Sequence, residues 1–284
     1  MQGYMGPIIA VTLIVLLTEI AMGRHRGIYR KQDWLVIGLP AVLNPAITRS
    51  LAGMLIAGTA GLLLPAYKGA LAHLPFLPSY LALLLVAEFC FYWGHRWAHE
   101  GQRVSWLGWL WKIHRTHHAG KYMNVLVTLR INLFWSFVVP TSWVVGFATY
   151  LGQGYAAAMV ILTVFGWNLI THANFRWDDR VRAHPRFGRW FRAFEHVIVS
   201  PGMHHTHHGY GKDGGSYRNY AVTFAFLDWM FGTMHIPSGR PWRYGVPGPN
   251  PHWAEEVFYP LYRSRTAPDE QAPGPVVSEA RAAS

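Results

Sequence analysis

The chain has 284 residues, of which 51% are hydrophobic and only 14% are charged, and its formal net charge is +11. Soluble domains usually carry about 25% charged residues, so this composition argues against an ordinary soluble protein. A nucleic-acid-binding protein would also be basic, but it would not carry long apolar runs, so no nucleic-acid partner is expected. The single cysteine, Cys90, excludes disulfides within the chain and cysteine-based zinc fingers. The fourteen tryptophans and the basic charge fit an integral membrane protein with aromatic belts and a basic face.

Five apolar segments are predicted to cross the membrane as helices, because roughly 20 apolar residues span a hydrocarbon core of about 30 Å. In chain order they are residues 4–23, 50–66, 79–95, 133–152 and 154–172. The stretch 34–49, which contains Pro40, Pro45 and Arg49, is predicted to be interfacial or bent. At their tightest the last two segments are separated only by residues 151–153, so they are predicted to form a helical hairpin.

Basic residues follow alternate segments, and this asymmetry sets the predicted orientation. Four basic residues lie in 24–31, six lie in 96–130, and six arginines lie in 176–192, whereas only Lys68 lies between the second and third segments. The N-terminus is therefore predicted outside, with the histidine-rich segments and the C-terminus cytoplasmic. The predicted fold class is all-α: a polytopic integral membrane helical bundle with a cytoplasmic helical cap that carries the histidine motifs.

Three regions are predicted along the chain. Residues 1–78 form N-terminal transmembrane segments and a linker, and residues 79–247 form a domain that contains the histidine motifs, partly in the membrane and partly in the cytosol. Residues 248–284 form a C-terminal tail, which is polar and rich in proline and alanine and is predicted to be disordered from about residue 265.

Histidines recur at helical spacing in three motifs close to the ends of predicted spans. HRWAH places two histidines at i and i+4, while HRTHH and HHTHH each place three at i, i+3 and i+4, and one more histidine ends the fifth span. Residues at these spacings share one helix face, so each motif is predicted to direct its imidazoles toward one point. The candidate metal ligands are His95, His99, His114, His117, His118, His172, His204, His207 and His208.

Nine imidazoles exceed the four closed ligands of a structural zinc site, and they are enough for two metal ions with four or five nitrogens each. Imidazole suits zinc, copper, iron and nickel, so ligand type leaves the metal open. Open coordination positions favour redox chemistry or metal-activated water. His205 is predicted to point away from the metals and to tolerate substitution. The remaining six histidines are predicted to be ordinary surface or core residues: His25, His73, His184, His196, His235 and His252.

The three motifs, in this order and with these spans, resemble the fatty acid hydroxylase / sterol desaturase superfamily of membrane histidine-box enzymes. The similarity covers residues 80–247 and extends to FYWGHRWAHE, THANF, SPGMHHTHHG, NYAVTFAFLDWMFGT and RPWRYGV. Around the third motif it is loosely similar to alkylglycerol-monooxygenase-like members. The resemblance implies an O₂-dependent non-haem di-iron enzyme that hydroxylates or desaturates a C–H position of a lipid.

The same resemblance implies the cofactors and partners. The nine histidines are the implied ligands of two Fe ions, with zinc able to replace iron on purification, and a water, Asn174 or His196 completes a set of ten. The implied partners are a fatty acyl, sterol or related lipid, the membrane, and a separate electron donor, either a ferredoxin or a b-type cytochrome with its reductase. A separate donor is needed because this sequence holds no CxxCH, no GxGxxG and no cysteine set for an iron–sulfur cluster.

Two acidic residues are predicted to support the ligands. Glu88 falls on one helical stripe with His95 and His99, where its carboxylate would accept a ligand's second N–H and fix its tautomer. Asp228 is a second candidate for the same role. Arg130 is interpreted as an anchor at the cytoplasmic membrane surface.

Three other functions compete with lipid hydroxylation. A lipid desaturase uses the same scaffold. A membrane metal transporter would need ionisable ligands deep in several spans, whereas only Glu19 and Glu88 are acidic residues within them. A zinc-dependent hydrolase would need a carboxylate base within its motif, as in HExxH, and none of the three motifs has one.

Overall fold

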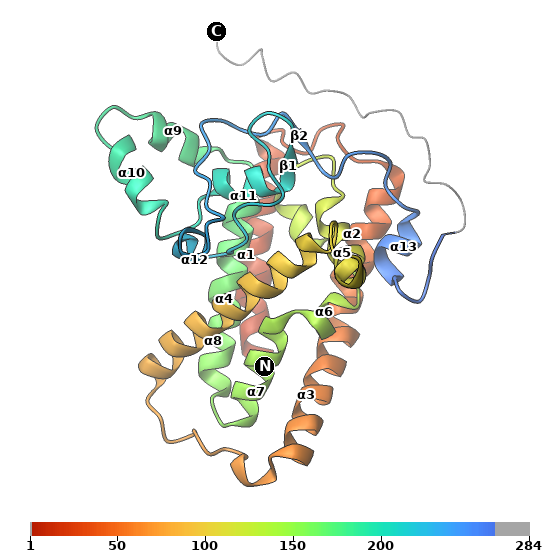
Figure 1. Cartoon of the computed structure of the whole chain (residues 1–284), viewed down its shortest axis with the longest axis vertical. Helices are drawn as coiled ribbons and strands as arrows, with labels where there is room; N and C mark the ends of the chain where they lie inside the picture. Colours follow the sequence, from red (N-terminus) through yellow and green to blue (C-terminus); the bar gives the residue numbers. More distant parts are fainter. Residues whose placement is uncertain (1, 265–284) are drawn as a thin grey trace.

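A computed structural model describes residues 2–264, and almost all of its regular structure is helical. Figure 1 shows long helices forming a bundle in the lower part of the molecule and short helices forming a cap above it. The bundle contains α1 (Gln2–Ala21), α2 (Lys31–Leu43), η1 (Asn44–Thr48), α3 (Arg49–Leu63), η2 (Pro65–Tyr67), α4 (Phe76–Glu100), α6 (Trp135–Val138), α7 (Pro140–Tyr150) and α8 (Gly154–His172). The cap contains η3 (Ser105–Leu107), α5 (Gly108–His118), η4 (Val125–Leu129), α9 (Trp177–Ala183), α10 (Gly188–Phe194), α11 (Pro201–His208), β1 (Gly209–Tyr210), α12 (Ala225–Met230), β2 (Arg243–Tyr244) and α13 (Trp253–Phe258).

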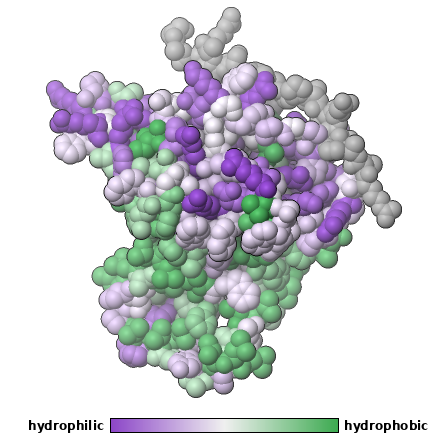
Figure 2. Space-filling view, viewed as in Figure 1, coloured by the Kyte–Doolittle hydropathy of each residue, from purple (hydrophilic) through white to green (hydrophobic). Residues whose placement is uncertain are grey.

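Three helical segments are long and apolar enough to cross a membrane: Lys31–Leu63, Phe76–Glu100 and Gly154–His172. α1 adds a shorter apolar segment, Ile8–Ala21. Side chains such as Leu62 and Leu63 are 84% and 73% exposed, which suits contact with lipid and not with water. Figure 2 shows this apolar surface covering the lower part of the molecule, while the upper part is mostly hydrophilic. The predicted all-α membrane bundle is confirmed.

The segment 31–63 corrects the predicted start of the second span at residue 50, and of the two alternatives predicted for residues 34–49, interfacial or bent, it agrees with the bent one. α2, η1 and α3 follow one another without a break, so one continuous helical run contains Pro40 and Pro45. The run continues because residues 44–48 form a π-helical turn, which accommodates one extra residue where proline removes a backbone donor. The proline-rich stretch therefore bends a long span and does not lie apart from it.

The predicted span 133–152 is also wrong in its length. Val139 is extended, with φ −65° and ψ 123°, because Pro140 disfavours helix at the residue before it. α7 has 11 residues, which at 1.5 Å per residue gives about 16 Å, well short of a hydrocarbon core of about 30 Å. The predicted hairpin is confirmed, since α7 packs on α8 across a turn at Gly152, whose φ of +97° favours glycine.

α4 is central because it contacts α5, α7 and α8. The backbone of α4 approaches α7 closely at Gly94, where a Cβ atom would lie only 2.5 Å from Cγ of Pro140. In the cap, β1 and β2 form a two-residue antiparallel pair, Gly209 with Tyr244 and Tyr210 with Arg243. This pair holds the chain that leaves α11.

Arg130 does not anchor the protein at the membrane surface, because its side chain is completely buried. It donates to Asp33 of α2, to both carboxylate oxygens of Glu256 in α13 at 3.2 and 3.3 Å, and to the carbonyl of Thr116 in α5 at 3.3 Å. A charge can be buried when it is paired and hydrogen-bonded in this way. Arg130 thus joins α5 to an N-terminal helix and to the last described helix.

The predicted division at residues 78 and 247 stays a prediction. α13 lies beyond the second of these boundaries and packs on α2 and α5. The tail predicted to be disordered from about residue 265 lies outside the described residues.

Replacing Arg130 by alanine is expected to lower the free energy of unfolding by about 3–5 kcal/mol, because it leaves two carboxylates buried without their counter-charge. The matched control is Arg115→Ala, whose ion pair with Glu255 is long (3.6 Å) and partly exposed, so its loss costs about 1 kcal/mol or less. Equilibrium unfolding in detergent micelles measures both. Equal losses from the two variants would contradict the role assigned to Arg130.

Candidate metal centre

The structure brings all nine candidate histidines together at the cap ends of α4 and α8. α4 and α5 supply the first two motifs, α8 supplies His172 from its last residue, and α11 supplies the third motif. Eight of the nine side chains are buried, and His117 is partly buried. Four elements that are distant in sequence therefore converge on one polar site inside an otherwise apolar region.

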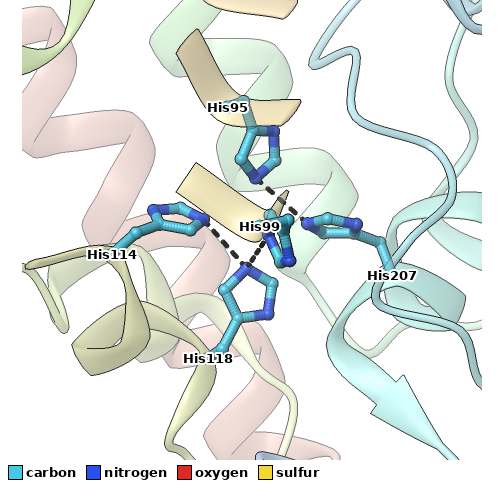
Figure 3. A group of neighbouring side chains, drawn as sticks. All are labelled: His95, His99, His114, His118 and His207. Atoms are coloured by element: carbon cyan, nitrogen blue, oxygen red, sulfur yellow. Dashed lines mark hydrogen bonds between the residues drawn. The ribbon is translucent and has the colours of Figure 1, made fainter. Parts of the chain in front are cut away.

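The nine imidazoles form two groups of possible metal ligands, and the ligand atoms of each group lie within 4.8 Å of one another. The groups adjoin, since the ring of His118 stacks on that of His208 at 4.3 Å. Figure 3 shows the larger group, with its rings pointing toward a common centre. The first group contains His95, His99, His114, His118 and His207, and the second contains His117, His172, His204 and His208.

The grouping corrects the expectation that each motif points at one place. In the second motif, His114 and His118 belong to the first group and His117 belongs to the second. In the third motif, His207 belongs to the first group, and His204 and His208 belong to the second. Residues at i and i+4 are about 40° apart around a helix, whereas i+3 and i+4 are about 100° apart. A short helix between the two groups can therefore serve both.

Hydrogen bonding fixes which ring nitrogen of three histidines carries the proton. Nδ1 of His95 lies 2.6 Å from the carbonyl oxygen of Tyr220. The corresponding distance is 2.7 Å from Nδ1 of His207 to the carbonyl of Arg218, and 2.7 Å from Nδ1 of His172 to the carbonyl of Asn168. A carbonyl only accepts, so each Nδ1 donates, and a neutral ring then presents a bare lone pair on Nε2. The Nε2 atoms of His95 and His207 lie 3.1 Å apart. Two lone pairs at this distance repel unless a cation lies between them.

The spacing of the donor atoms fits metal coordination. Neighbouring Nε2 atoms are 3.0–3.1 Å apart in the first group and 3.1–3.2 Å apart in the second. Nitrogens about 2.1 Å from a metal are about 3.0 Å apart at a right angle and about 3.4 Å apart at a tetrahedral angle. The observed values lie close to the separations expected for imidazole nitrogens that share one metal ion.

Burial also keeps the cap histidines in the form that binds metal. Removal from water lowers the pKa of each cap imidazole well below its usual value, and nearby imidazoles lower it further. These rings are therefore neutral near pH 7, and neutral imidazole is the ligating form. The statement covers His114, His117, His118, His204, His207 and His208.

Glu88 and Asp228 support the site in a different way from the one predicted. Neither carboxylate accepts a hydrogen bond from a histidine in the described structure. Glu88 accepts from the backbone N–H and the hydroxyl of Thr223 at 2.9 and 3.0 Å. Asp228 accepts from the backbone N–H groups of Tyr220 and Ala221 at 2.7 and 2.9 Å, and burial raises its pKa to about 6. Both residues hold the segment whose Tyr220 carbonyl orients His95.

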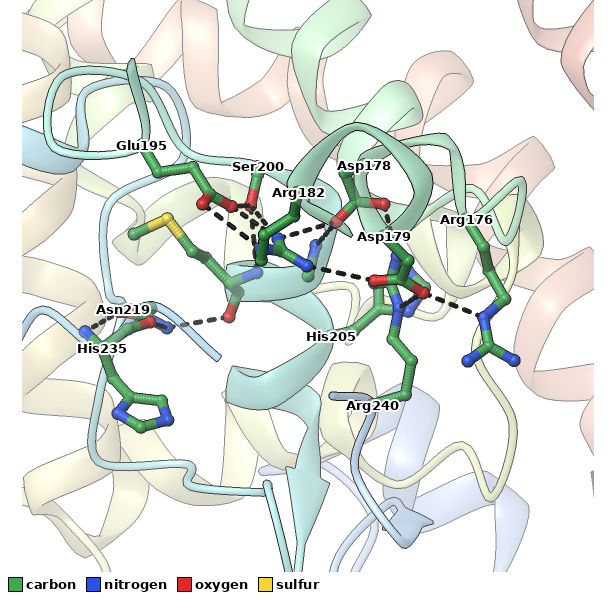
Figure 4. Close-up of polar contacts among 12 residues, drawn as sticks. Arg176, Asp178, Asp179, Arg182, Glu195, Ser200, His205, Asn219, His235 and Arg240 are labelled. Atoms are coloured by element: carbon green, nitrogen blue, oxygen red, sulfur yellow. Dashed lines mark hydrogen bonds and ion pairs between the residues drawn. The ribbon is translucent and has the colours of Figure 1, made fainter. Parts of the chain in front are cut away.

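An ion-pair network that the sequence did not reveal holds the start of α11, as Figure 4 shows. Ser200 begins the helix and donates to Glu195 at 2.6 Å, and the backbone N–H of Gly202 donates to Asp178 at 2.6 Å. Arg182 lies between these two carboxylates and donates to both. The sequence signal was the pair of aspartates inside an arginine-rich stretch, but the partner of each charge depends on the fold.

Glu19 is a second residue whose role was missed. Its carboxylate is fully buried and accepts from the backbone N–H of Val125 at 3.0 Å and from that of Asn174 at 2.6 Å. These segments follow the second motif and His172, so Glu19 joins two ligand-bearing elements to α1. His25 also contacts Glu19, at 3.0 Å.

His205 points away from both groups, as expected, but its predicted tolerance to substitution conflicts with its surroundings. The ring is fully buried, and its Nδ1 lies 3.2 Å from the hydroxyl of Tyr244 in β2. None of the six remaining histidines joins either group within residues 2–264. Asn174 contributes its backbone N–H to Glu19, and its role as a tenth ligand stays a prediction, whereas His196 joins neither group.

Comparison with known families decides how this site is classified. The model of the family described as fatty acid hydroxylase matches residues 80–233, more than half of the chain. The chain belongs to the fatty acid hydroxylase family. The match contains all three histidine motifs and His172, together with Glu88 and Asp228. No solved structure matches the chain significantly.

Relatives of this fatty acid hydroxylase-family chain are named as monooxygenases and as an aldehyde decarbonylase. They include alkylglycerol monooxygenase from Xenopus tropicalis (27% identical over 58% of this chain and 32% of the relative). Methylsterol monooxygenase 2-1 from Arabidopsis thaliana is 27% identical over 60% of this chain and 58% of the relative. Very-long-chain aldehyde decarbonylase GL1-11 from Oryza sativa subsp. indica is 29% identical over 60% of each. The match thus spans from about one third to three fifths of these relatives.

Asp228→Asn is expected to weaken metal binding about 10- to 100-fold, because an amide cannot accept both backbone N–H groups equally and the Tyr220 carbonyl is then less well held against His95. Competition with a chelator measures the affinity. The control is Asp213→Asn, because Asp213 has a φ of +59° that asparagine tolerates. Unchanged affinity in folded Asp228→Asn protein would show that the carbonyl does not orient the ligand.

Proposed function

We propose that the protein is an O₂-dependent membrane oxidoreductase that hydroxylates a C–H position of a lipid, with a di-iron centre held by the nine histidines. The observation that carries the proposal is the division of these histidines into adjoining groups of five and four. The family is iron-dependent, and several related proteins are named monooxygenases. Iron accepts imidazole ligands, and when bound it would supply the redox chemistry with O₂ that amino-acid side chains lack.

The residues of this chain bind and orient the metals in this proposal. His95, His172 and His207 donate from Nδ1 to backbone carbonyls and so present Nε2 to the ions. The two groups contain nine imidazoles and no carboxylate, which argues against a hydrolase that needs a carboxylate base. The absence of a carboxylate refers to the two groups as found among residues 2–264.

The membrane position supports a lipid substrate. The two histidine groups lie at the ends of α4 and α8, which are long enough to cross a bilayer. A chain held among the membrane helices would reach the metals without leaving the apolar region. We place the cap, the histidines and the C-terminus in the cytoplasm and the N-terminus outside, because the basic residues gather in the segments that lie on the cap side.

Electrons would come from a separate donor, a ferredoxin or a b-type cytochrome with its reductase. The net charge of +11 gives the chain a basic character that attracts an acidic partner. Salt should therefore slow reduction by such a donor, since long-range attraction is screened.

Paired substitutions are expected to separate the two groups. The double variant His99→Ala/His207→Ala should bind about one metal ion fewer than the unaltered protein, which is expected to bind two. The double variant His172→Ala/His204→Ala should show the same loss, because each pair disrupts only one group. Elemental analysis of purified protein gives the metal content. The control pair is His73→Ala with His196→Ala, outside both groups. A loss as large in the control pair would show that the groups are not the metal sites.

Cells that express the protein with iron and an electron donor are expected to form new lipid products only when O₂ is present. Mass spectrometry of total lipids should show products that carry one additional oxygen atom, and labelled O₂ should supply it. Loss of two hydrogen atoms in their place would identify a desaturase. The His99→Ala/His207→Ala protein is the control, because it keeps the membrane helices. An unchanged lipid profile despite a metal-loaded protein would contradict the proposal.

A further inference from the structure

The lobe between α8 and α11 carries an apolar stripe whose side chains are largely exposed among residues 2–264. Phe187, Trp190, Phe194 and Val197 recur at intervals of three and four residues and so share one face of α10 and the turn after it. Their exposed fractions are 59%, 64%, 41% and 50%. Phe191 lies on another face and packs on Trp177 at 5.6 Å between ring centroids. The lobe therefore has its own small core, on whose edge Phe194 stacks at 6.0 Å from Phe191, while the other faces of the stripe stay exposed.

Three arginines on the same lobe give the surroundings of this stripe a positive charge. Arg186, Arg189 and Arg192 lie on the same lobe, and none of them forms an ion pair within the described part of the chain. The guanidinium of Arg189 lies 5.0 Å from the ring centre of Trp190. Arg182, by contrast, is used inside the lobe, where it pairs with buried carboxylates. The three outer arginines are therefore available to an anionic partner.

The lobe that carries the stripe is joined to a segment that packs on the membrane helix α4. The backbone N–H of Val199, just beyond the stripe, donates to the carbonyl of Thr223 at 2.9 Å, which places the lobe beside the segment that leads into α12. Trp229 of α12 is 65% exposed. Phe231, just after α12, packs on Trp93 of the membrane helix α4 at 4.9 Å. Figure 1 shows α10 and α12 on the same side of the molecule, above the lower half of α4.

We propose that α10 is an in-plane membrane anchor whose apolar stripe enters the bilayer interface and whose arginines bind the phosphates of anionic phospholipids. Tryptophan and phenylalanine are favoured at the level of the headgroups, and guanidinium groups form charge-assisted hydrogen bonds with phosphate. An acidic protein could also be attracted by the arginines. The link from the lobe through Thr223 and Phe231 to α4 favours lipid, because the membrane lies against that helix.

A spin label tests the depth of α10 directly, and the single native cysteine makes this practical. In a Cys90→Ala background, Trp190→Cys and Trp242→Cys are labelled in the full-length protein, in nanodiscs of phosphatidylcholine with phosphatidylglycerol. Trp242 is a matched control because it is 65% exposed and pairs with Arg243 at 4.5 Å, beside β2 at the top of the cap in Figure 1. The label at 190 should collide with oxygen and be shielded from a water-soluble nickel chelate, whereas the label at 242 should show the reverse.

Lipid binding tests the arginines. Arg189→Gln should weaken retention of phosphatidylglycerol, measured by native mass spectrometry, about fivefold, which corresponds to about 1 kcal/mol per basic residue at a membrane surface. Arg243→Gln should leave retention unchanged. Labelling at Phe187→Cys gives a second position if Trp190→Cys protein does not fold.

Two results would overturn the proposal. One is a label at 190 that is as accessible to the nickel chelate as the label at 242. The other is protection of position 190 that occurs only when an acidic electron-donor protein is added, which would assign the stripe to that protein. The depth measurement needs neither metal nor substrate, so its outcome is independent of the proposed reaction.

Discussion

The structure depends on electrostatic repulsion among nine closely packed imidazoles, eight of them buried, whose ring nitrogens face one another at about the separation of metal ligands. Where Nδ1 is committed to a carbonyl, as in His95 and His207, the facing nitrogens offer only lone pairs. Repulsion between lone pairs in a low-dielectric interior is not relieved by water. A bound cation removes the repulsion, and the surrounding cap must hold the rings in place whether or not one is bound.

The cap holds them by joining each ligand-bearing element to another part of the chain through a buried charge. Glu19 links the segments after the second motif and after His172 to α1. Arg130 links α5 to α2 and α13, and Arg182 with its carboxylates fixes the start of α11. Buried ion pairs contribute little net stability, so their value here lies in the fixed positions they impose on neighbouring backbone.

The sequence was sufficient to predict the all-α membrane bundle and the candidate histidines, because both follow from local periodicity. Runs of apolar residues and spacings of three and four residues need no knowledge of distant contacts. The sequence did not predict that a π-helical turn would let the helix continue past Pro45, that Pro140 would shorten α7, or that Arg130 would be buried. The break before Pro140 follows from a local rule that the span prediction did not apply. The burial of Arg130, by contrast, depends on partners far along the chain, and a charge at a span end looks the same whether it faces lipid headgroups or two carboxylates.

The division of the second and third motifs between two groups has a consequence for the spacing of the two histidine groups. α5 and α11 each give ligands to both groups from within a single helical turn. The interval between the two centres is thus set by the pitch and radius of an α-helix, which vary little, and not by loops, which vary freely. Relatives could differ widely in loops, tails and substrate pockets while the helix geometry kept the two histidine groups at the same separation.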